Sequence, residues 1–70
     1  MIPVEILQKN AMEQVRIWRE PYKGHDLVHM RLFFQNDSGE WLPTRKGLVL
    51  RPELAKQAAE VLLGLLEQDN

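Results

Sequence analysis

The segment from residue 52 to residue 67 most strongly constrains the fold, because its apolar side chains recur at helical spacing around more than one side of a helix. Pro52 suits the first helical position, where its missing N–H removes a donor that would have no partner. The apolar positions are Leu54, Ala55, Ala58, Val61, Leu62, Leu65 and Leu66, and Ala59 and Leu63 extend the stripe. A helix this apolar is expected to contact both its own sheet and a second surface.

The length of the chain makes a second copy the expected partner for that helix. Seventy residues form one domain, spanning residues 1–70, and a chain of this size buries only about 60% of the surface its unfolded form exposes. The absence of cysteine excludes disulfides and thiolate metal sites, which leaves dimerisation or unusually good packing as sources of stability. We therefore expect a homodimer. The residues expected at the helix contact are Leu54, Ala58, Val61, Leu62 and Leu65.

Residues before the helix alternate between apolar and polar, which predicts strands. The expected strands cover residues 14–22, 27–35 and a third run in two pieces, 40–42 and 46–50, with a further edge strand within 2–8. Residues 23–26 and 36–39 carry turn signals. The fold class is α+β, with four antiparallel strands followed by one C-terminal helix.

Charge is distributed unevenly along the chain. The net charge of −1 argues against a simple nucleic-acid binder, which usually carries a basic excess. Residues 14–51 nevertheless contain seven cations and four acids, whereas residues 52–70 carry −3. A local basic surface on the strands is therefore expected, without a strong long-range field.

Rings and cations occur together on the expected strands. They are Arg16, Trp18, Tyr22, Lys23, Arg31, Phe33 or Phe34, Trp41, Arg45 and Lys46. Proteins that bind single-stranded nucleic acid combine cations along the backbone with rings on which bases stack. The alternative interpretation is that the rings are core and the cations are solvated. Strand alternation favours the nucleic-acid-binding interpretation, because it places Trp18 on the same side as Arg16 and Tyr22, away from Val15 and Ile17.

Other functional classes find little support. His25 and His29 would lie roughly 13 Å apart along a strand, too far for one metal ion. The chain has no cysteine, its only serine is Ser38 in a turn, and its glycines do not form a phosphate loop, so we expect neither an enzyme nor a cofactor. No twenty-residue apolar run or signal-peptide pattern occurs, and we expect an intracellular protein without a membrane partner.

The order of these features resembles a known family. The resemblance rests on the order of five features: a strand ending in Tyr22-Lys23-Gly24, a strand with Arg31, a hairpin turn, the segment Pro43-Thr44-Arg45-Lys46-Gly47-Leu48-Val49-Leu50, and a helix starting at Pro52-Glu53. In this order of features, the chain resembles the single-stranded-DNA-binding domain of the positive cofactor 4 family of transcriptional coactivators. The resemblance covers about residues 14–66 and suits the compact bacterial and phage members. It implies a curved four-stranded antiparallel sheet, a dimer paired through its helices, and channels for two antiparallel single strands.

The resemblance also assigns roles to particular positions. It places the family's aromatic on Tyr22, its strand arginine on Arg31, its stacking tryptophan on Phe34, and its basic pair on Arg45 and Lys46. The family commonly has glycine where this chain has Thr44. Phe34 is opposite in parity to Arg31, so Phe33 is the alternative stacking ring unless a bulge intervenes.

The expected function is therefore binding of single-stranded DNA with little sequence preference. The residues expected to contact DNA are Arg16, Trp18, Tyr22, Lys23, Arg31, Phe34, Trp41, Arg45 and Lys46. The alternative function is a protein-interaction module that uses the sheet to bind another protein. Roles in transcription, replication, recombination and repair all stay open, as do partners in the transcription or replication machinery, because each of these processes exposes single strands.

Overall fold

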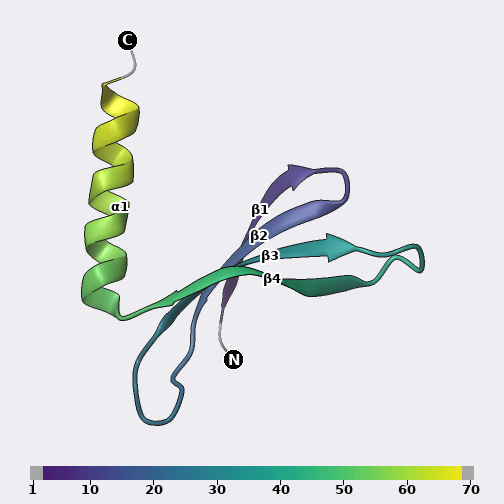
Figure 1. The fold of residues 1–70 in the computed structure, drawn as a ribbon, viewed down its shortest axis with the longest axis horizontal. Coiled ribbons are helices and arrows are strands. Elements are labelled where there is room, and N and C mark those ends of the chain that lie inside the picture. The colour runs from purple at the N-terminus through teal and green to yellow at the C-terminus, as the bar shows by residue number, and fades with distance from the viewer. Residues whose placement is uncertain (1–2, 69–70) are drawn as a thin grey trace.

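The computed structural model describes residues 3–68, which form an open, twisted four-stranded antiparallel sheet followed by one helix (Figure 1). The strands are β1 (Val4–Asn10), β2 (Glu13–Arg19), β3 (Val28–Gln35) and β4 (Trp41–Leu50), and the helix is α1 (Pro52–Glu67). Each strand pairs with its neighbours in sequence, in the order β1-β2-β3-β4. The expected α+β class, the edge position of the first strand and the helix bounds are confirmed. Ile2, at the start of the expected first strand, lies outside the described residues.

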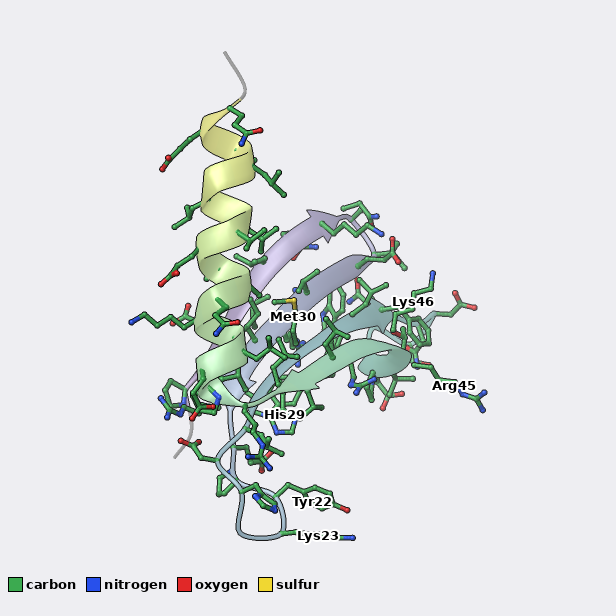
Figure 2. All side chains as sticks on the ribbon, turned by 60° about the vertical axis from the view of Figure 1, so that its left-hand side comes forward. Tyr22, Lys23, His29, Met30, Arg45 and Lys46 are labelled. Carbon is green, nitrogen blue, oxygen red and sulfur yellow. The ribbon has the colours of Figure 1, made fainter. Side chains whose placement is uncertain are left out.

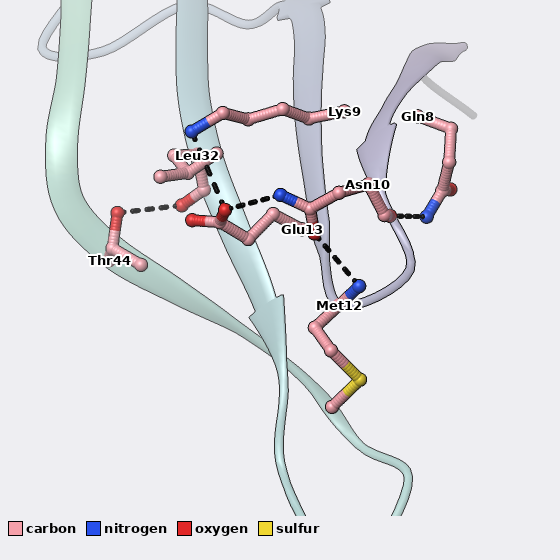
Figure 3. Close-up of polar contacts among 7 residues, drawn as sticks. All are labelled: Gln8, Lys9, Asn10, Met12, Glu13, Leu32 and Thr44. Carbon is pink, nitrogen blue, oxygen red and sulfur yellow. Dashed lines mark hydrogen bonds and ion pairs between the residues drawn. The ribbon is translucent and has the colours of Figure 1, made fainter.

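The β1–β2 turn is held by the side chain of Asn10 (Figure 3). Its Oδ1 accepts the backbone N–H of Met12 at 3.0 Å, and its Nδ2 donates to Oε1 of Glu13 at 2.7 Å. Lys9 Nζ lies 3.4 Å from the same carboxylate oxygen. The Asn10 hydrogen bond, with help from the charge of Lys9, lowers the pKa of Glu13.

The β2–β3 connection is a narrow arm, so strand β2 ends at Arg19 and not at residue 22 as expected. Tyr22 and His25 exchange backbone hydrogen bonds of 2.8 and 3.0 Å around a two-residue turn. The turn residues, Lys23 and Gly24, have φ of 51° and 80°, the left-handed values that a type I′ hairpin needs. Tyr22 therefore lies near the tip of an arm, outside the sheet.

An ion pair closes the base of this arm. The Arg19 guanidinium donates to the Asp26 carboxylate, with Nε 3.0 Å from Oδ1. This hydrogen bond lowers the pKa of Asp26 and raises the pKa of Arg19. The ion pair thus joins the two sides of the arm at the point where the β2–β3 hydrogen-bond ladder ends.

Strand β4 is one continuous strand with an irregularity, where the sequence suggested two pieces. Arg31 pairs with Gly47 and Phe33 pairs with Pro43, so residues 44–46 of β4 face the single residue Leu32 of β3. The extra residues bulge out of the ladder and bend the strand.

Helix α1 follows β4 directly and extends away from the strand ends (Figure 1). It begins with Pro52, and Arg51 before it supplies no side-chain cap. No helix in residues 3–68 is long and apolar enough to span a membrane.

The apolar side chains are incompletely covered. No residue in the described part of the chain is fully buried, and Leu62, Leu63, Leu65 and Leu66 of α1 expose between 56% and 67% of their surface. The radius of gyration is 14.1 Å, against about 11 Å for a compact domain of 70 residues. The accessible surface is 5914 Å², about 1,400 Å² above the roughly 4,500 Å² of a compact monomer of this mass.

Part of this uncovered surface lines a cavity of about 300 Å³ between the sheet and α1. Figure 2 shows Met30 pointing into this space from the sheet. The cavity is lined by Ile17, Val28, Met30, Leu48, Leu50, Ala55, Ala58, Ala59 and Leu62. The apolar surfaces of the sheet and of α1 therefore face each other without enough side chains between them to fill the cavity.

Candidate nucleic-acid interface

Strand register divides the sheet into two chemically different faces. We call the face turned toward α1 the apolar face; its apolar members in β2, β3 and β4 are Val15, Ile17, Val28, Met30, Leu32, Phe34, Leu42, Leu48 and Leu50, and it also carries Glu13 and Arg19 on β2. We call the other the aromatic face; its members in β2, β3 and β4 are Gln14, Arg16, Trp18, His29, Arg31, Phe33, Gln35, Trp41, Pro43, Gly47 and Val49, and Val4, Ile6 and Gln8 of β1 lie on the same side. Met30 and His29 lie on opposite sides of the sheet in Figure 2.

The rings of the aromatic face touch one another across strands. Trp18 and His29 are cross-strand partners, and their rings stack with centroids 5.1 Å apart and planes 9° from parallel. Phe33 meets Trp18 edge to face at 6.3 Å. These rings are half-buried, so each presents part of its surface to solvent. They form a continuous platform across β2 and β3.

Arg16 lies at the centre of this platform. Its Cζ is 4.4 Å from the Phe33 ring centroid and 5.9 Å from the Trp41 ring centroid. Its Nε and Nη2 donate to Oε1 of Gln14 at 3.2 and 3.1 Å. Because a guanidinium carries five N–H donors, several remain for a ligand. Neutral groups thus orient the side chain, and no acid pairs with it within residues 3–68.

Arg31 is the direct cross-strand partner of Arg16. Its Nη1 donates to the backbone carbonyl of Thr44 at 2.9 Å. The guanidinium passes over Gly47, where an added Cβ would lie 2.9 Å from the Arg31 Cζ. Like charges directly opposite in a sheet are destabilising, and within residues 3–68 neither arginine forms an ion pair with an acid. An anion that contacts both guanidinium groups would offset this repulsion.

One carboxylate lies at the border of the aromatic face. Glu20 Oε1 accepts the indole N–H of Trp18 at 3.1 Å, and the backbone oxygen of Glu20 lies 3.2 Å from His29 Nε2. Both rings of the stacked pair are thereby held at their edges. The stack is oriented by the first residue of the β2–β3 arm.

Other residues expected at the site lie elsewhere. Tyr22 is 59% exposed near the tip of the arm, and Lys23 Nζ lies 5.4 Å from its ring centroid (Figure 2). Arg45 and Lys46 leave the β4 bulge in different directions (Figure 2), and Lys46 borders a hollow on the apolar face beside Val15.

Phe34 lies on the apolar face opposite Glu13, away from Arg31. The ring that shares a face with Arg31 is Phe33, the alternative that strand parity left open. The structure thus brings together Arg16, Trp18, Arg31 and Trp41, and adds Phe33. His29 was not among the expected site residues, although alternation along its strand placed it on the same face.

Potential metal ligands are dispersed. No group of three His, Asp or Glu side chains gathers anywhere in the described residues 3–68. The site that the structure does assemble consists of cations and rings.

Comparison with known proteins identifies the family of this fold. The family model described as Transcriptional Coactivator p15 (PC4) matches residues 9–60. The chain belongs to the PC4 family. This confirms the resemblance to positive cofactor 4 seen in the sequence. No curated protein matches the chain significantly.

Solved structures of bacterial and phage PC4 homologues share the fold. A PC4 homologue from Burkholderia pseudomallei is 35% identical, with a TM-score of 0.81 over 94% of this chain and 88% of that one. A bacteriophage T5 homologue of the coactivator, described as implicated in recombination-dependent DNA replication, is 23% identical, with a TM-score of 0.76 over 96% of this chain and 78% of that one. A compact prokaryotic or phage-type PC4 member therefore fits this chain.

Proposed function

We propose that this PC4 family member binds single-stranded DNA on the aromatic face with little sequence preference. The observation that carries the proposal is the direct opposition of Arg16 and Arg31, without an acidic partner in the described residues, beside the rings of Trp18 and Phe33. A phosphate between the two guanidinium groups would relieve their repulsion by charge-assisted hydrogen bonds. The neighbouring rings would then receive bases.

A single strand suits this surface better than a duplex. Stacking on a protein ring requires a base whose face is free, and a duplex hides those faces. Stacking tolerates any base, because every base has a π face, so little sequence preference is expected. The description of the phage T5 relative, which links it to recombination-dependent DNA replication, supports a ligand of this kind.

The remaining cations and rings extend the proposed path beyond the platform. Trp41 continues it along β4, where Arg45 adds a cation at the bulge. At the other end, Tyr22 and Lys23 on the β2–β3 arm offer an exposed ring and an ammonium group. We assign the stacking role on β3 to Phe33, since Phe34 belongs to the apolar face.

The active form in this proposal is a homodimer joined through α1. A standard interface buries roughly 800 Å² per partner, and the chain carries about 1,400 Å² of surface beyond that of a compact monomer. The apolar positions cover roughly 200° of the helix circumference at 100° per residue, more than the sheet-facing side alone requires. A second copy would cover the rest of α1 and the cavity beside it. Replacing Leu62 with glutamate would bury a charge at that contact and should yield a monomeric mass by light scattering.

Binding to a fluorescent poly-dT oligonucleotide tests the proposed DNA site. Arg16→Ala and Arg31→Ala should each weaken binding and reduce the slope of log K against log salt by about 0.7 for each phosphate that the variant no longer neutralises. Lys56→Ala is the matched control, because it removes one positive charge from the polar side of α1. If both arginine variants kept the parent affinity and salt slope, the aromatic face would not be the DNA site.

The basic pair of the bulge requires its own variant. Arg45→Ala combined with Lys46→Ala should lower affinity for all sequences to a similar extent without unfolding the protein. An unchanged affinity would remove the bulge from the proposed path.

The second candidate function is binding of a protein by the sheet, favoured by the net charge of −1. Retention on single-stranded compared with double-stranded DNA resin at moderate salt separates the two. Because the proposed ligand is DNA, we place the protein inside the cell, in transcription, replication, recombination or repair, and we assign it no catalytic role.

A further inference from the structure

The bulge in β4 is bridged by the side chain of Thr44. Residues 44–46 face Leu32 alone, so the regular ladder between β3 and β4 is interrupted there. The Thr44 hydroxyl donates to the Leu32 carbonyl at 2.8 Å (Figure 3) and accepts the backbone N–H of Lys46 at 3.1 Å. A single hydroxyl thus satisfies one backbone acceptor of β3 and one backbone donor of β4.

The same residue holds Arg31. The carbonyl oxygen of Thr44 accepts Nη1 of Arg31 at 2.9 Å, and the position of that carbonyl depends on the path of the bulge. The guanidinium reaches it by crossing Gly47, where a Cβ would lie 2.8 Å from the Met30 carbonyl oxygen and 2.9 Å from the Arg31 Cζ. The Thr44 carbonyl in the bulge and the space above Gly47 thus determine where the Arg31 guanidinium lies.

This placement matters because arginine is otherwise flexible. An unconstrained arginine side chain samples many rotamers, and part of that freedom is lost when a ligand immobilises it. The hydrogen bond to Thr44 removes some of that freedom before any ligand arrives, and it uses only one of the five guanidinium donors. Arg31 is thus oriented beside Arg16 with donors to spare.

We propose that Thr44 is a positioning residue for anion recognition: its hydroxyl fixes the β4 bulge, and the bulge holds the Arg31 guanidinium opposite Arg16 so that both can contact one phosphate. This inference rests on the proposed DNA-binding function and names the device that orients the site. Thr44 itself does not contact the DNA. Its effect on affinity therefore passes through Arg31.

A double-mutant cycle on poly-dT binding tests this dependence. Thr44→Val keeps the side-chain shape and removes both hydroxyl hydrogen bonds, and it should weaken binding by about three- to tenfold, as expected for one rotamer-rich side chain that loses its preorganisation. In an Arg31→Ala background the same substitution should change affinity less than twofold. Thr44→Ser, which keeps the hydroxyl, should restore the parent affinity. Equal losses in both backgrounds would overturn the proposal.

A second comparison does not depend on the folding of Thr44→Val. Arg31→Lys keeps the charge but loses the planar fork that reaches both the Thr44 carbonyl and a phosphate, so it should weaken poly-dT binding several-fold. Arg51→Lys is the matched control, because within residues 3–68 that side chain makes no capping hydrogen bond or ion pair and lies outside the proposed DNA path, and it should leave the affinity within about twofold. Equal affinities for these two variants would also overturn the positioning role.

The two proposals fail in different ways. A parent protein that does not bind poly-dT at low salt would refute the proposed function, and the inference about Thr44 with it. The positioning role alone would be refuted if the parent bound poly-dT and Arg31→Ala weakened that binding, but the effects of the substitutions at residues 44 and 31 were independent of each other.

Discussion

Replacing Leu62 with alanine should destabilise the proposed dimer by an amount that follows from its exposure. Leu62 lines the cavity between α1 and the sheet, yet 56% of its surface stays exposed in one chain. Full burial of a leucine side chain contributes about 1.5–3 kcal/mol, so the exposed part is worth about 1–2 kcal/mol once a partner covers it. A symmetric dimer contains two copies, which gives about 2–4 kcal/mol and a roughly 30- to 900-fold higher dissociation constant.

Sedimentation across a concentration series measures this change, and the thermal midpoint at each concentration measures the linked stability. Gln57→Ala is the matched control, because it lies on the polar side of the same helix and also shortens a side chain to alanine. The control should leave the dissociation constant within about twofold. The reasoning would be refuted if Leu62→Ala and Gln57→Ala dissociated alike, or if the parent sedimented as a monomer at all concentrations.

Three further predictions concern other parts of the structure. Gly47→Ala should lower the free energy of unfolding by about 1–3 kcal/mol in chemical denaturation, because its Cβ would lie 2.8 Å from a carbonyl oxygen of β3; an unchanged midpoint would contradict that contact. Asp26 has a pKa lowered by Arg19, so its ion pair stabilises the fold above about pH 4 and is lost as pH falls through the folded pKa. The thermal midpoint of the parent should therefore exceed that of Asp26→Asn at pH 6 and approach it at pH 2, whereas a constant gap would contradict the linkage. Phe33→Ala should weaken poly-dT binding by about 1–3 kcal/mol while Phe34→Ala should not, and the reverse order would place the stacking ring on the other face.

The alternation of side chains predicted most of the sheet and the composition of its faces. The pattern around Arg31 placed His29 and Phe33 with it and placed Met30 and Phe34 on the other side, and the register confirms this division. Alternation succeeds because successive side chains of a strand point to opposite faces whatever the strand pairs with. The resemblance to the family assigned stacking to Phe34, which strand parity did not support.

Strand ends and bulges were less predictable. The alternation continues through Tyr22, yet the ladder stops at Arg19, because two residues with positive φ close a narrow arm beyond it. The sequence predicted an interruption at residues 43–45 but did not show that Thr44 bridges it. Such features depend on which backbone groups find partners across strands, and that information is not local.

The sequence by itself determined the four strands, the helix, the two faces of the sheet and the excess of apolar surface on α1, because each follows from the periodicity of side chains along a local segment. Only the tertiary structure decided that Arg16 and Arg31 are cross-strand partners, that the rings of Trp18 and His29 stack, and that Gly47 leaves space for the Arg31 guanidinium. The physical reason is register. A shift of one residue between two strands would preserve every local pattern and would separate each of these pairs.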